Sequence, residues 1–152
     1  MKSIVNQAKD VNSASTYQIT TNMIEEKRIV LIDDDPITNL VNTRLFTKHL
    51  PAKIDVYSNP LVALANLKEL ALTGRGDFPD YIFLDINMPE MEGWDFLDAF
   101  QAFPETVQKS CRIIILTSSV DFCDVERSKT YASVWDFISK PLTPERVRMM
   151  TT

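Results

Sequence analysis

Two short apolar runs in this sequence end in carboxylates. The first run is followed at once by Asp33, Asp34 and Asp35, and a later run is followed by Asp85. Carboxylates gathered this closely repel one another, so a folded protein that holds them together needs a compensating cation. The pattern therefore indicates a site for a metal ion or another positive group.

Two further apolar runs end in groups of a different character. The run 112–116 leads into Thr117, and the run 134–138 leads through a serine into Lys140. Open α/β sheets place their ligands at the carboxyl ends of their strands. If the four runs are parallel strands of one sheet, acids, a hydroxyl and an amine meet at the same edge and form a site.

From residue 27 onwards the sequence alternates between strand and helix patterns. Continuous apolar runs such as Ile29–Ile32 are typical of parallel strands that are covered on both faces. We predict five strands that alternate with five helices, the strands lying at 28–32, 53–57, 81–85, 112–117 and 134–138. This alternation predicts an α/β fold, a doubly wound five-stranded parallel sheet with helices on both faces. Periodicity alone leaves the strand order open.

Prolines and capping residues indicate where the helices begin. Pro36 follows Asp35, and Pro60 follows Ser58 and Asn59, so these polar residues are expected caps of the first two helices. The apolar residues expected to form the inner face of the first helix are Leu40, Val41, Leu45, Phe46 and Leu50. Later helices are expected from Gly93, over 120–131 and after the cap Thr143, with only a turn at 104–106.

Composition limits the class of protein. A chain of 152 residues, 45% hydrophobic and 24% charged, fits one globular domain. The net charge of −5, without a basic run, disfavours direct binding to nucleic acid. No apolar stretch reaches the length of a membrane span, and Cys111 and Cys123 lack metal-ligand spacing, so we expect a reduced, cytoplasmic protein without membrane insertion. Residues 1–26 are read as a polar, disordered or loosely helical extension, and residues 27–152 as the domain.

Four motifs together resemble a known family. They are Asp33-Asp34, the run Asp85-x-Asn87-Met88-Pro89-x-Met91-x-Gly93, Thr117-Ser118 and Lys140-Pro141. In this order, each at a strand end, they resemble the receiver domain of two-component response regulators of the chemotaxis-regulator type, over residues 28 to about 150. The resemblance implies a flavodoxin-like strand order 2-1-3-4-5. It also implies a Lys140–Pro141 peptide bond that is often cis.

The resemblance assigns a role to each acid. Asp85 would accept a phosphoryl group from a phosphohistidine of a histidine kinase or phosphotransfer protein. The implied cofactor is Mg²⁺, with Asp34 as a direct ligand, Asp33 acting through water, and Asp85 and the backbone carbonyl of Asn87 completing the protein ligands. Mg²⁺ suits such a set because it prefers a few carboxylate or carbonyl oxygens together with water and phosphate oxygens.

Signalling residues are implied in the same way. Thr117 and Lys140 would bond the phosphoryl oxygens, and Phe137 would be the aromatic switch. Because Phe137 lacks a hydroxyl, we expect it to favour its inward position in the free protein. Phosphorylation would then alter the face formed by the helix near 120–131, the strand 134–138 and the last helix, where a downstream protein or a second copy of the chain would bind. Trp135 is the expected partner-surface residue.

Two other functions remain open. A Mg²⁺-dependent phosphohydrolase with an aspartate nucleophile would carry a second acid two residues later, but Asn87 stands there after Asp85, and Asp35 stands there after Asp33 without a matching motif. A receiver-like interaction module that no longer takes phosphate would have lost site residues, and all are present. We expect a stand-alone signalling phosphoprotein of a phosphorelay, with no enzymatic activity beyond self-catalysed phosphotransfer and dephosphorylation.

Overall fold

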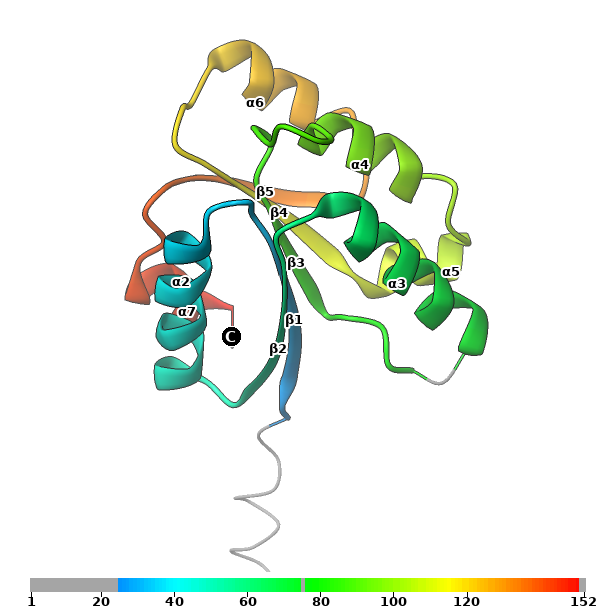
Figure 1. Cartoon of the computed structure of the whole chain (residues 1–152), viewed down its shortest axis with the longest axis horizontal. Helices are drawn as coiled ribbons and strands as arrows, with labels where there is room; N and C mark the ends of the chain where they lie inside the picture. Colours follow the sequence, from blue (N-terminus) through cyan, green and yellow to red (C-terminus); the bar gives the residue numbers. More distant parts are fainter. Residues whose placement is uncertain (1–24, 75, 151–152) are drawn as a thin grey trace, which may run out of the picture.

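The protein folds around one sheet of five parallel strands. A computed structural model describes residues 25–74 and 76–150. The strands are β1 (Lys27–Ile32), β2 (Ala52–Tyr57), β3 (Tyr81–Leu84), β4 (Arg112–Thr117) and β5 (Val134–Ser139). They lie in the order β2-β1-β3-β4-β5 (Figure 1). The expected doubly wound, flavodoxin-like order is therefore confirmed. Most of the predicted 1–26 extension lies outside the described residues.

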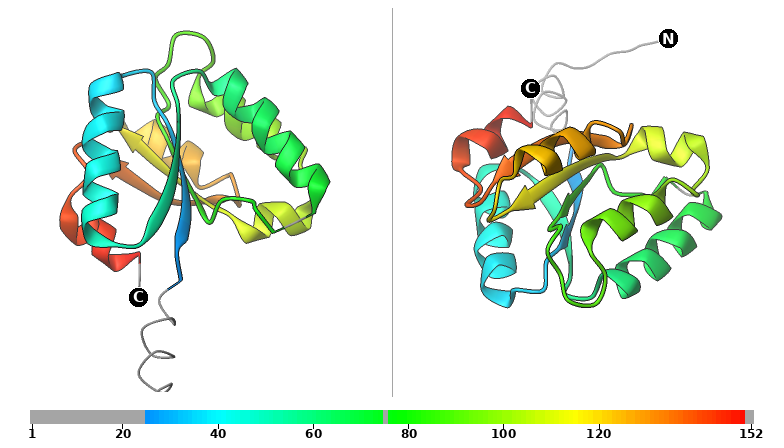
Figure 2. Two further views of the ribbon diagram at one scale, coloured as in Figure 1. Left: turned by 60° about the horizontal axis from the view of Figure 1, so that its bottom comes forward. Right: turned by 90° about the horizontal axis from the view of Figure 1, so that it is seen from above.

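Helices cover both faces of the sheet, as the alternating pattern predicted. Those described are α2 (Pro36–His49), α3 (Pro60–Thr73), α4 (Gly93–Phe100), α5 (Glu105–Ser110), α6 (Phe122–Ser128) and α7 (Pro144–Met149). The helices α2 and α7 lie on one face, and α3 and α4 lie on the other (Figure 2). Each face buries its own apolar cluster, and the strand residues alternate between the two clusters. None of the helices described is long and apolar enough to cross a membrane.

The sheet continues beyond the strand ends through backbone hydrogen bonds, and this extension aligns the polar residues. The amide of Asp33 donates to the carbonyl of Tyr57 at 3.1 Å, and the amide of Asp85 donates to the carbonyl of Ile32 at 3.0 Å. The amide of Lys140 donates to the carbonyl of Thr117 at 2.7 Å. Residues from β1, β3, β4 and β5 are thus held side by side at one edge.

The inner face of α2 differs from the prediction. Leu40 and Val41 are exposed by 51% and 54%, whereas Phe46 is buried together with Asn39 and Asn42. Positions three, four and seven apart share one face of a helix, and residues 39, 42 and 46 follow that spacing. Choosing the apolar residues of this helix by type alone placed two of them on the wrong side. The buried face of α2 begins with two amides.

Local signals account for most helix ends, with two exceptions. The side chains of Asp35 and Asn59 accept hydrogen bonds from the amides of Ile37 and Leu61, as the predicted caps should. The segment after Pro104 is wrong as a turn, because it forms α5. There the Gln108 side chain donates to the carbonyls of two preceding loop residues and secures the short helix, a contact between residues that periodicity does not reveal. The helix α6 is shorter than predicted.

A glycine places α4 against the loop that follows β3. A Cβ atom on Gly93 would lie 2.6 Å from the Cα of Ile86, closer than side-chain atoms approach backbone. The amide of Gly93 donates to the carbonyl of Ile86 at 3.1 Å. Only glycine permits this approach without displacing the loop. The loop from Asp85 to Gly93 is thereby folded back over the edge of the sheet. The Lys140–Pro141 bond is cis, as the resemblance implied.

Candidate functional site

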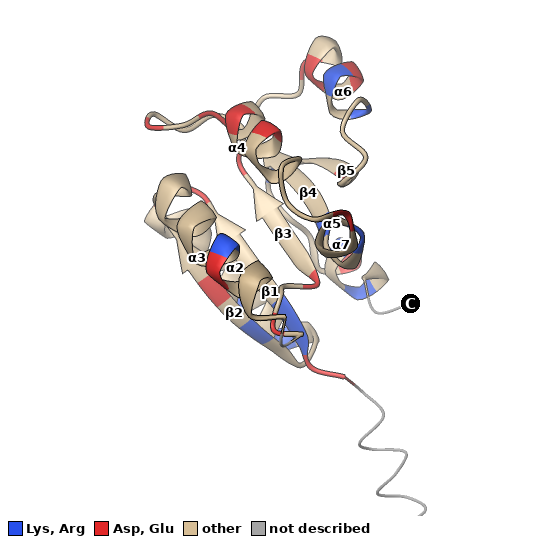
Figure 3. Cartoon of the chain, turned by 90° about the vertical axis from the view of Figure 1, so that its right-hand side faces the viewer, with Lys and Arg blue, Asp and Glu red and all other residues tan. Residues whose placement is uncertain are grey.

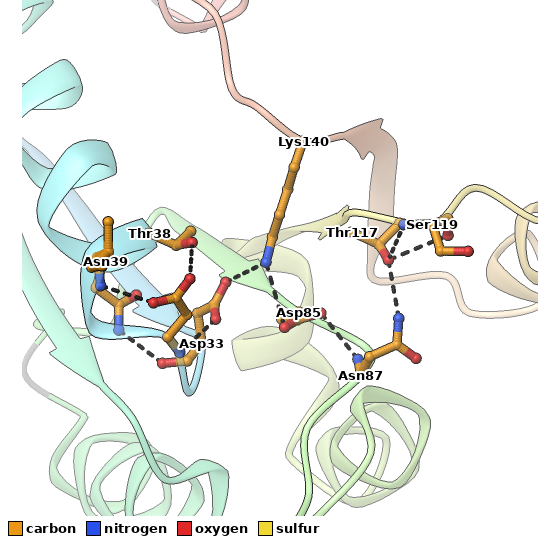
Figure 4. Close-up of polar contacts among 10 residues, drawn as sticks. Asp33, Thr38, Asn39, Asp85, Asn87, Thr117, Ser119 and Lys140 are labelled. Carbon is orange, nitrogen blue, oxygen red and sulfur yellow. Dashed lines mark hydrogen bonds and ion pairs between the residues drawn. The ribbon is translucent and has the colours of Figure 1, made fainter.

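Lys140 reaches two carboxylates at the edge of the sheet. Its Nζ lies 2.7 Å from Oδ2 of Asp33 and 3.5 Å from Oδ2 of Asp85 (Figure 4). The lysine follows β5, whereas the two acids follow β1 and β3, so the contact closes across the width of the sheet. The structure therefore brings together the amine and the acids that the sequence placed at separate strand ends.

Three carboxylates form a cluster beside this lysine. Oxygen atoms of Asp33, Asp34 and Asp85 lie within 4.8 Å of one another, and no other such group of three occurs in residues 25–74 and 76–150. Asp33 and Asp85 are buried, whereas Asp34 is exposed. A cluster of oxygen ligands with one side open to solvent suits Mg²⁺, which keeps several waters when bound. The donor set fits the cofactor implied by the sequence.

Burial and the lysine act in opposite directions on the charge of Asp85. Burial raises the pKa of this carboxyl above its ordinary value of 3.8, while the amide of Asn87 and the amine of Lys140 oppose the rise. Burial lowers the pKa of Lys140, but hydrogen bonding and attraction to Asp33 and Asp85 outweigh it, so the net shift is upward. Lys140 therefore stays charged and offsets part of the repulsion within the cluster.

Loose contacts surround the hydroxyl of Thr117 on the opposite side of Asp85. Its Oγ1 accepts hydrogen bonds from Nδ2 of Asn87 and from the amide of Ser119, and donates to the carbonyl of Ser119. Each of the three distances is 3.3 Å, long for bonds to a hydroxyl. The Thr117 side chain is buried and lies on the same edge as Asp85 (Figure 4). The hydroxyl of Thr117 therefore lies at the predicted edge of the sheet and is held only by long hydrogen bonds.

Asp35 belongs to the helix rather than to the cluster, as expected. Its carboxylate accepts hydrogen bonds from the amide of Ile37 and from the hydroxyl of Thr38. The Thr38 bond, followed by the Ile37 bond, lowers the pKa of the Asp35 carboxyl. The backbone amide of Asp35 donates to Oδ1 of Asp33 at 2.9 Å and so helps to fix that neighbouring side chain.

The two aromatic residues of β5 face different surroundings. Phe137 is half-buried and packs against the apolar cluster on the α3 and α4 side, so it does not point fully outward. Trp135 is 53% exposed, and the guanidinium of Arg112 lies 4.5 Å from its ring centroid. The switch role of Phe137 and the partner role of Trp135 stay predictions.

One buried residue of the site was missed from the sequence. The side-chain amide of Asn39 donates to the carbonyl of Asp33 at 2.8 Å from the first turns of α2. Asparagine in a helix is normally exposed, so its residue type gave no reason to place it inside. Helical spacing could have revealed its buried position, because Asn39 and Asn42 lie on the same face of α2 as the buried Phe46.

Comparison with known proteins settles the family. The model of the response regulator receiver domain matches residues 29–152. The chain belongs to this family. A probable C4-dicarboxylate response regulator of Halalkalibacterium halodurans is 31% identical over 125 residues, which are 82% of this chain and 50% of that protein. Histidine protein kinase 1 of Candida albicans is 30% identical over 131 residues, 82% of this chain and 5% of that protein. The chain spans half or less of the length of these relatives.

Solved receiver structures agree with the fold. A two-component response regulator from Cytophaga hutchinsonii is 30% identical with a TM-score of 0.75, covering 83% of this chain and 95% of that one. A response regulator receiver protein from Dyadobacter fermentans is 24% identical with a TM-score of 0.70, covering 81% and 93%. The second likeness concerns the fold alone. The family recognised from four motifs is thereby confirmed.

Acidic residues also dominate the surface beside the receiver site. The loop after β3 and the helix α4 carry Glu90, Glu92, Asp95 and Asp98 and no basic residue (Figure 3). The surface beside the site is therefore negatively charged, whereas the absence of direct nucleic-acid binding stays a prediction.

Proposed function

We propose that this receiver domain accepts a phosphoryl group on Asp85 with Mg²⁺ and passes the signal on through its surface. The observation that carries the proposal is the contact of Lys140 with both Asp33 and Asp85, at 2.7 and 3.5 Å, within the acid cluster. The donor is expected to be the phosphohistidine of a histidine kinase or phosphotransfer protein. A cytoplasmic location stays a prediction from the sequence.

The transfer itself needs few protein groups. A carboxylate oxygen of Asp85 attacks phosphorus, an O–P bond forms, and the P–N bond of the donor breaks with its electron pair leaving on the imidazole nitrogen. Such transfers pass through a loose, in-line transition state, so positioning and charge neutralisation account for most of the rate. Held by Asp34, Asp85 and the Asn87 carbonyl, with Asp33 acting through water, Mg²⁺ would neutralise charge on the phosphoryl oxygens.

Lys140 is suited to change partners during this reaction. Its shorter contact is to Asp33, at 2.7 Å, and its longer contact is to the acceptor Asp85, at 3.5 Å. Lysine carries a compact charge on a flexible stem, so it can turn from a carboxylate to a phosphoryl oxygen without a fixed bidentate geometry. We therefore assign it the role of holding the cluster together before transfer and pairing with the phosphoryl group afterwards.

Thr117 would carry the signal away from the site. Its 3.3 Å contacts are weak enough for the hydroxyl to turn toward a phosphoryl oxygen on Asp85. The segment after Thr117 leads into α6, and Phe137 lies on the neighbouring strand. Movement there would change the face formed by α6, β5 and α7, the proposed site for a downstream protein or for a homodimer.

The hydrolase alternative finds less support in the geometry. The side chain two residues after Asp85 is the amide of Asn87, which donates to Thr117 and has no acidic proton to give to a leaving group. Aspartyl phosphate hydrolysis is proposed only as the slow reset of the signal. Ser119 and Asn87 flank Thr117, and we assign them to tuning the rate of that reset.

Intact-mass spectrometry tests the proposal directly. The chain is incubated with acetyl phosphate and Mg²⁺, and the mass is compared with that of Asp85→Asn and of Asp121→Asn, a matched change at the exposed cap of α6. We expect one added phosphoryl group in the parent and in Asp121→Asn, and none in Asp85→Asn. No gain in the parent would favour the interaction module, and rapid turnover of an unrelated phosphate ester would favour the hydrolase.

A further inference from the structure

One buried polar atom beside the acid cluster has no partner in the protein. Nδ2 of Asn39 donates to the carbonyl of Asp33, but Oδ1 of the same amide accepts nothing from the residues that the structure describes. The Asn39 side chain is buried, with 6% of the residue exposed. Buried polar atoms of native proteins nearly always have a partner, either in the protein or in ordered water. This oxygen therefore points to a bound group.

A small recess has Asn39 in its wall. Its volume is about 10 Å³, and its walls combine polar and apolar side chains, namely Leu31, Ile32, Asp33, Asn39, Asn42, Phe83, Asp85 and Leu116. A space of about 10–15 Å³ with two to four polar partners holds one water molecule. A hydrated cation is larger than this recess. The size of the recess and the polar side chains in its wall suit a single water molecule.

The position of Asn42 completes the recess. It follows Asn39 by three residues on α2, so the two side chains lie on the same face of the helix, and Asn42 is also 6% exposed. A water between them could donate to Oδ1 of Asn39 and use its other sites on Asn42 or on the carboxylate of Asp85. The recess thus connects the inner face of α2 with the phosphoacceptor.

The same amide completes the restraint of Asp33. The backbone amide of Asp33 donates to the carbonyl of Tyr57, and the backbone carbonyl of Asp33 accepts from Asn39. Of its carboxylate oxygens, Oδ1 accepts from the amide of Asp35 and Oδ2 accepts from Lys140. The close-up shows the Asn39 side chain directed at the Asp33 backbone (Figure 4). Groups of this kind, which orient a metal ligand without touching the metal, commonly change metal affinity when removed.

We propose that Asn39 is a positioning residue of the receiver site, which fixes Asp33 directly and holds one water molecule buried against Asn42. The inference rests on the proposed function, because orienting Asp33 serves Mg²⁺ binding. It makes α2 a structural part of the metal site through its buried amides, in addition to the acids that precede the helix.

Mg²⁺ binding to the unphosphorylated protein tests the direct role. The dissociation constant is measured by NMR titration for the parent, Asn39→Leu, Asn66→Leu and Phe46→Leu. We expect Asn39→Leu to weaken binding about tenfold. Asn66→Leu makes the same chemical change on an exposed face of α3, and Phe46→Leu destabilises α2 without touching Asp33, so both should bind like the parent.

The outcomes separate this inference from the proposed function. Parent-like binding by Asn39→Leu, or equal weakening by Phe46→Leu, overturns the positioning role while leaving the function intact. A parent that binds no Mg²⁺ overturns both. If the parent gains a phosphoryl group from acetyl phosphate but Asn39→Leu binds Mg²⁺ as tightly as the parent, only the inference about Asn39 is contradicted.

A high-resolution crystal structure of the parent tests the water without any variant, and so covers the case in which Asn39→Leu fails to fold. We expect a water about 2.7–3.2 Å from Oδ1 of Asn39. A side chain that fills the recess in place of the water would overturn the proposal that Asn39 holds a water molecule. In Asn42→Val, which keeps the bond from Asn39 to Asp33, we expect the water to be lost and Mg²⁺ binding to weaken only about twofold to threefold, less than in Asn39→Leu.

Discussion

The two sides of the Asp85 pocket are restrained to different degrees. On the acid side, Asp33 takes part in bonds of 2.7–2.9 Å to Lys140, Asn39 and the amide of Asp35. On the hydroxyl side, the three contacts of Thr117 are all 3.3 Å long. Short charge-assisted bonds are about twice as strong as neutral ones, so the acid side resists movement more.

This difference matches the tasks proposed for each side. A metal site works best when its ligands are held in place before the ion arrives, because no ordering cost is then incurred on binding. A switch needs the opposite, a group with two positions of similar free energy that a new charge can bias. We therefore propose that the receiver site combines a fixed half, built on β1 and α2, with a mobile half, built on the end of β4.

Removing Lys140 should break the fixed half and give the largest effect. The side chain is only 18% exposed and pairs with two acids, so Lys140→Met leaves their charges without a partner. Breaking a buried ion pair of this kind costs about 3 kcal/mol. We expect a loss of that order in the free energy of unfolding, measured by urea denaturation without Mg²⁺, and part of the loss should be recovered when Mg²⁺ is added.

The control for this experiment is Lys129→Met. Lys129 pairs with Glu126 at 2.8 Å, but both side chains are largely exposed, at 66% and 48%. Exposed pairs contribute about 0.5 kcal/mol or less. Equal destabilisation by the two variants would show that Lys140 is no more than another surface ion pair and would remove the contrast between the halves.

Neutralising Asp85 should raise the free energy of unfolding, by less than the removal of Lys140 lowers it. Asp85→Asn keeps an oxygen to accept from the amide of Asn87 but removes a carboxylate from the cluster. The gain in stability should be about 1 kcal/mol at neutral pH without Mg²⁺, since removing the cost of burying this charge, with some relief of repulsion from Asp33, exceeds the loss of the 3.5 Å contact to Lys140. A loss of stability would mean that Lys140 already neutralises the cluster completely.

The pH dependence of that difference has a defined sign. Because burial raises the pKa of Asp85 in the folded protein, the native state binds this proton more readily than the unfolded chain does. The advantage of Asp85→Asn should therefore be complete above the folded pKa. It should shrink as the pH falls and vanish below the ordinary value of 3.8. Urea denaturation of both proteins at several pH values measures it.

For the fixed half, the sequence predicted where the acidic residues lie but missed the Asn39 amide that holds Asp33. Apolar runs of β-branched residues located the strands, and strand ends in a parallel sheet meet at one edge, so the meeting of Asp33, Asp85 and Lys140 followed from the pattern. The inward turn of Asn39 did not, because residue type favours an exposed position and only the packing of α2 against the sheet decides otherwise. Tertiary packing also reversed the expected burial of Leu40.

The mobile half escaped prediction for another reason. The sequence identified Thr117, but not how tightly the surrounding groups hold its hydroxyl, because bond lengths depend on the path of the loop after β4. The same limit applies to α5. The residues after Pro104 resemble a turn in the sequence, and the hydrogen bonds from the Gln108 side chain to the preceding loop appear only in the structure. Contacts between neighbouring loops are not encoded in periodicity.

The smallest effect on the resting protein, and the sharpest test of the mobile half, comes from Thr117→Val. The change removes three long hydrogen bonds and keeps the buried volume, so we expect a loss of only about 0.5–1 kcal/mol in the free energy of unfolding. Asp85 should still take phosphate, because its carboxylate and Lys140 are untouched. Hydrogen exchange of residues 118–128 should change on phosphorylation of the parent and of Thr117→Ser, which retains the hydroxyl. It should change little in Thr117→Val. A full response in the valine variant would assign the signal to another path from Asp85, and the weak contacts of Thr117 would then have no part in switching.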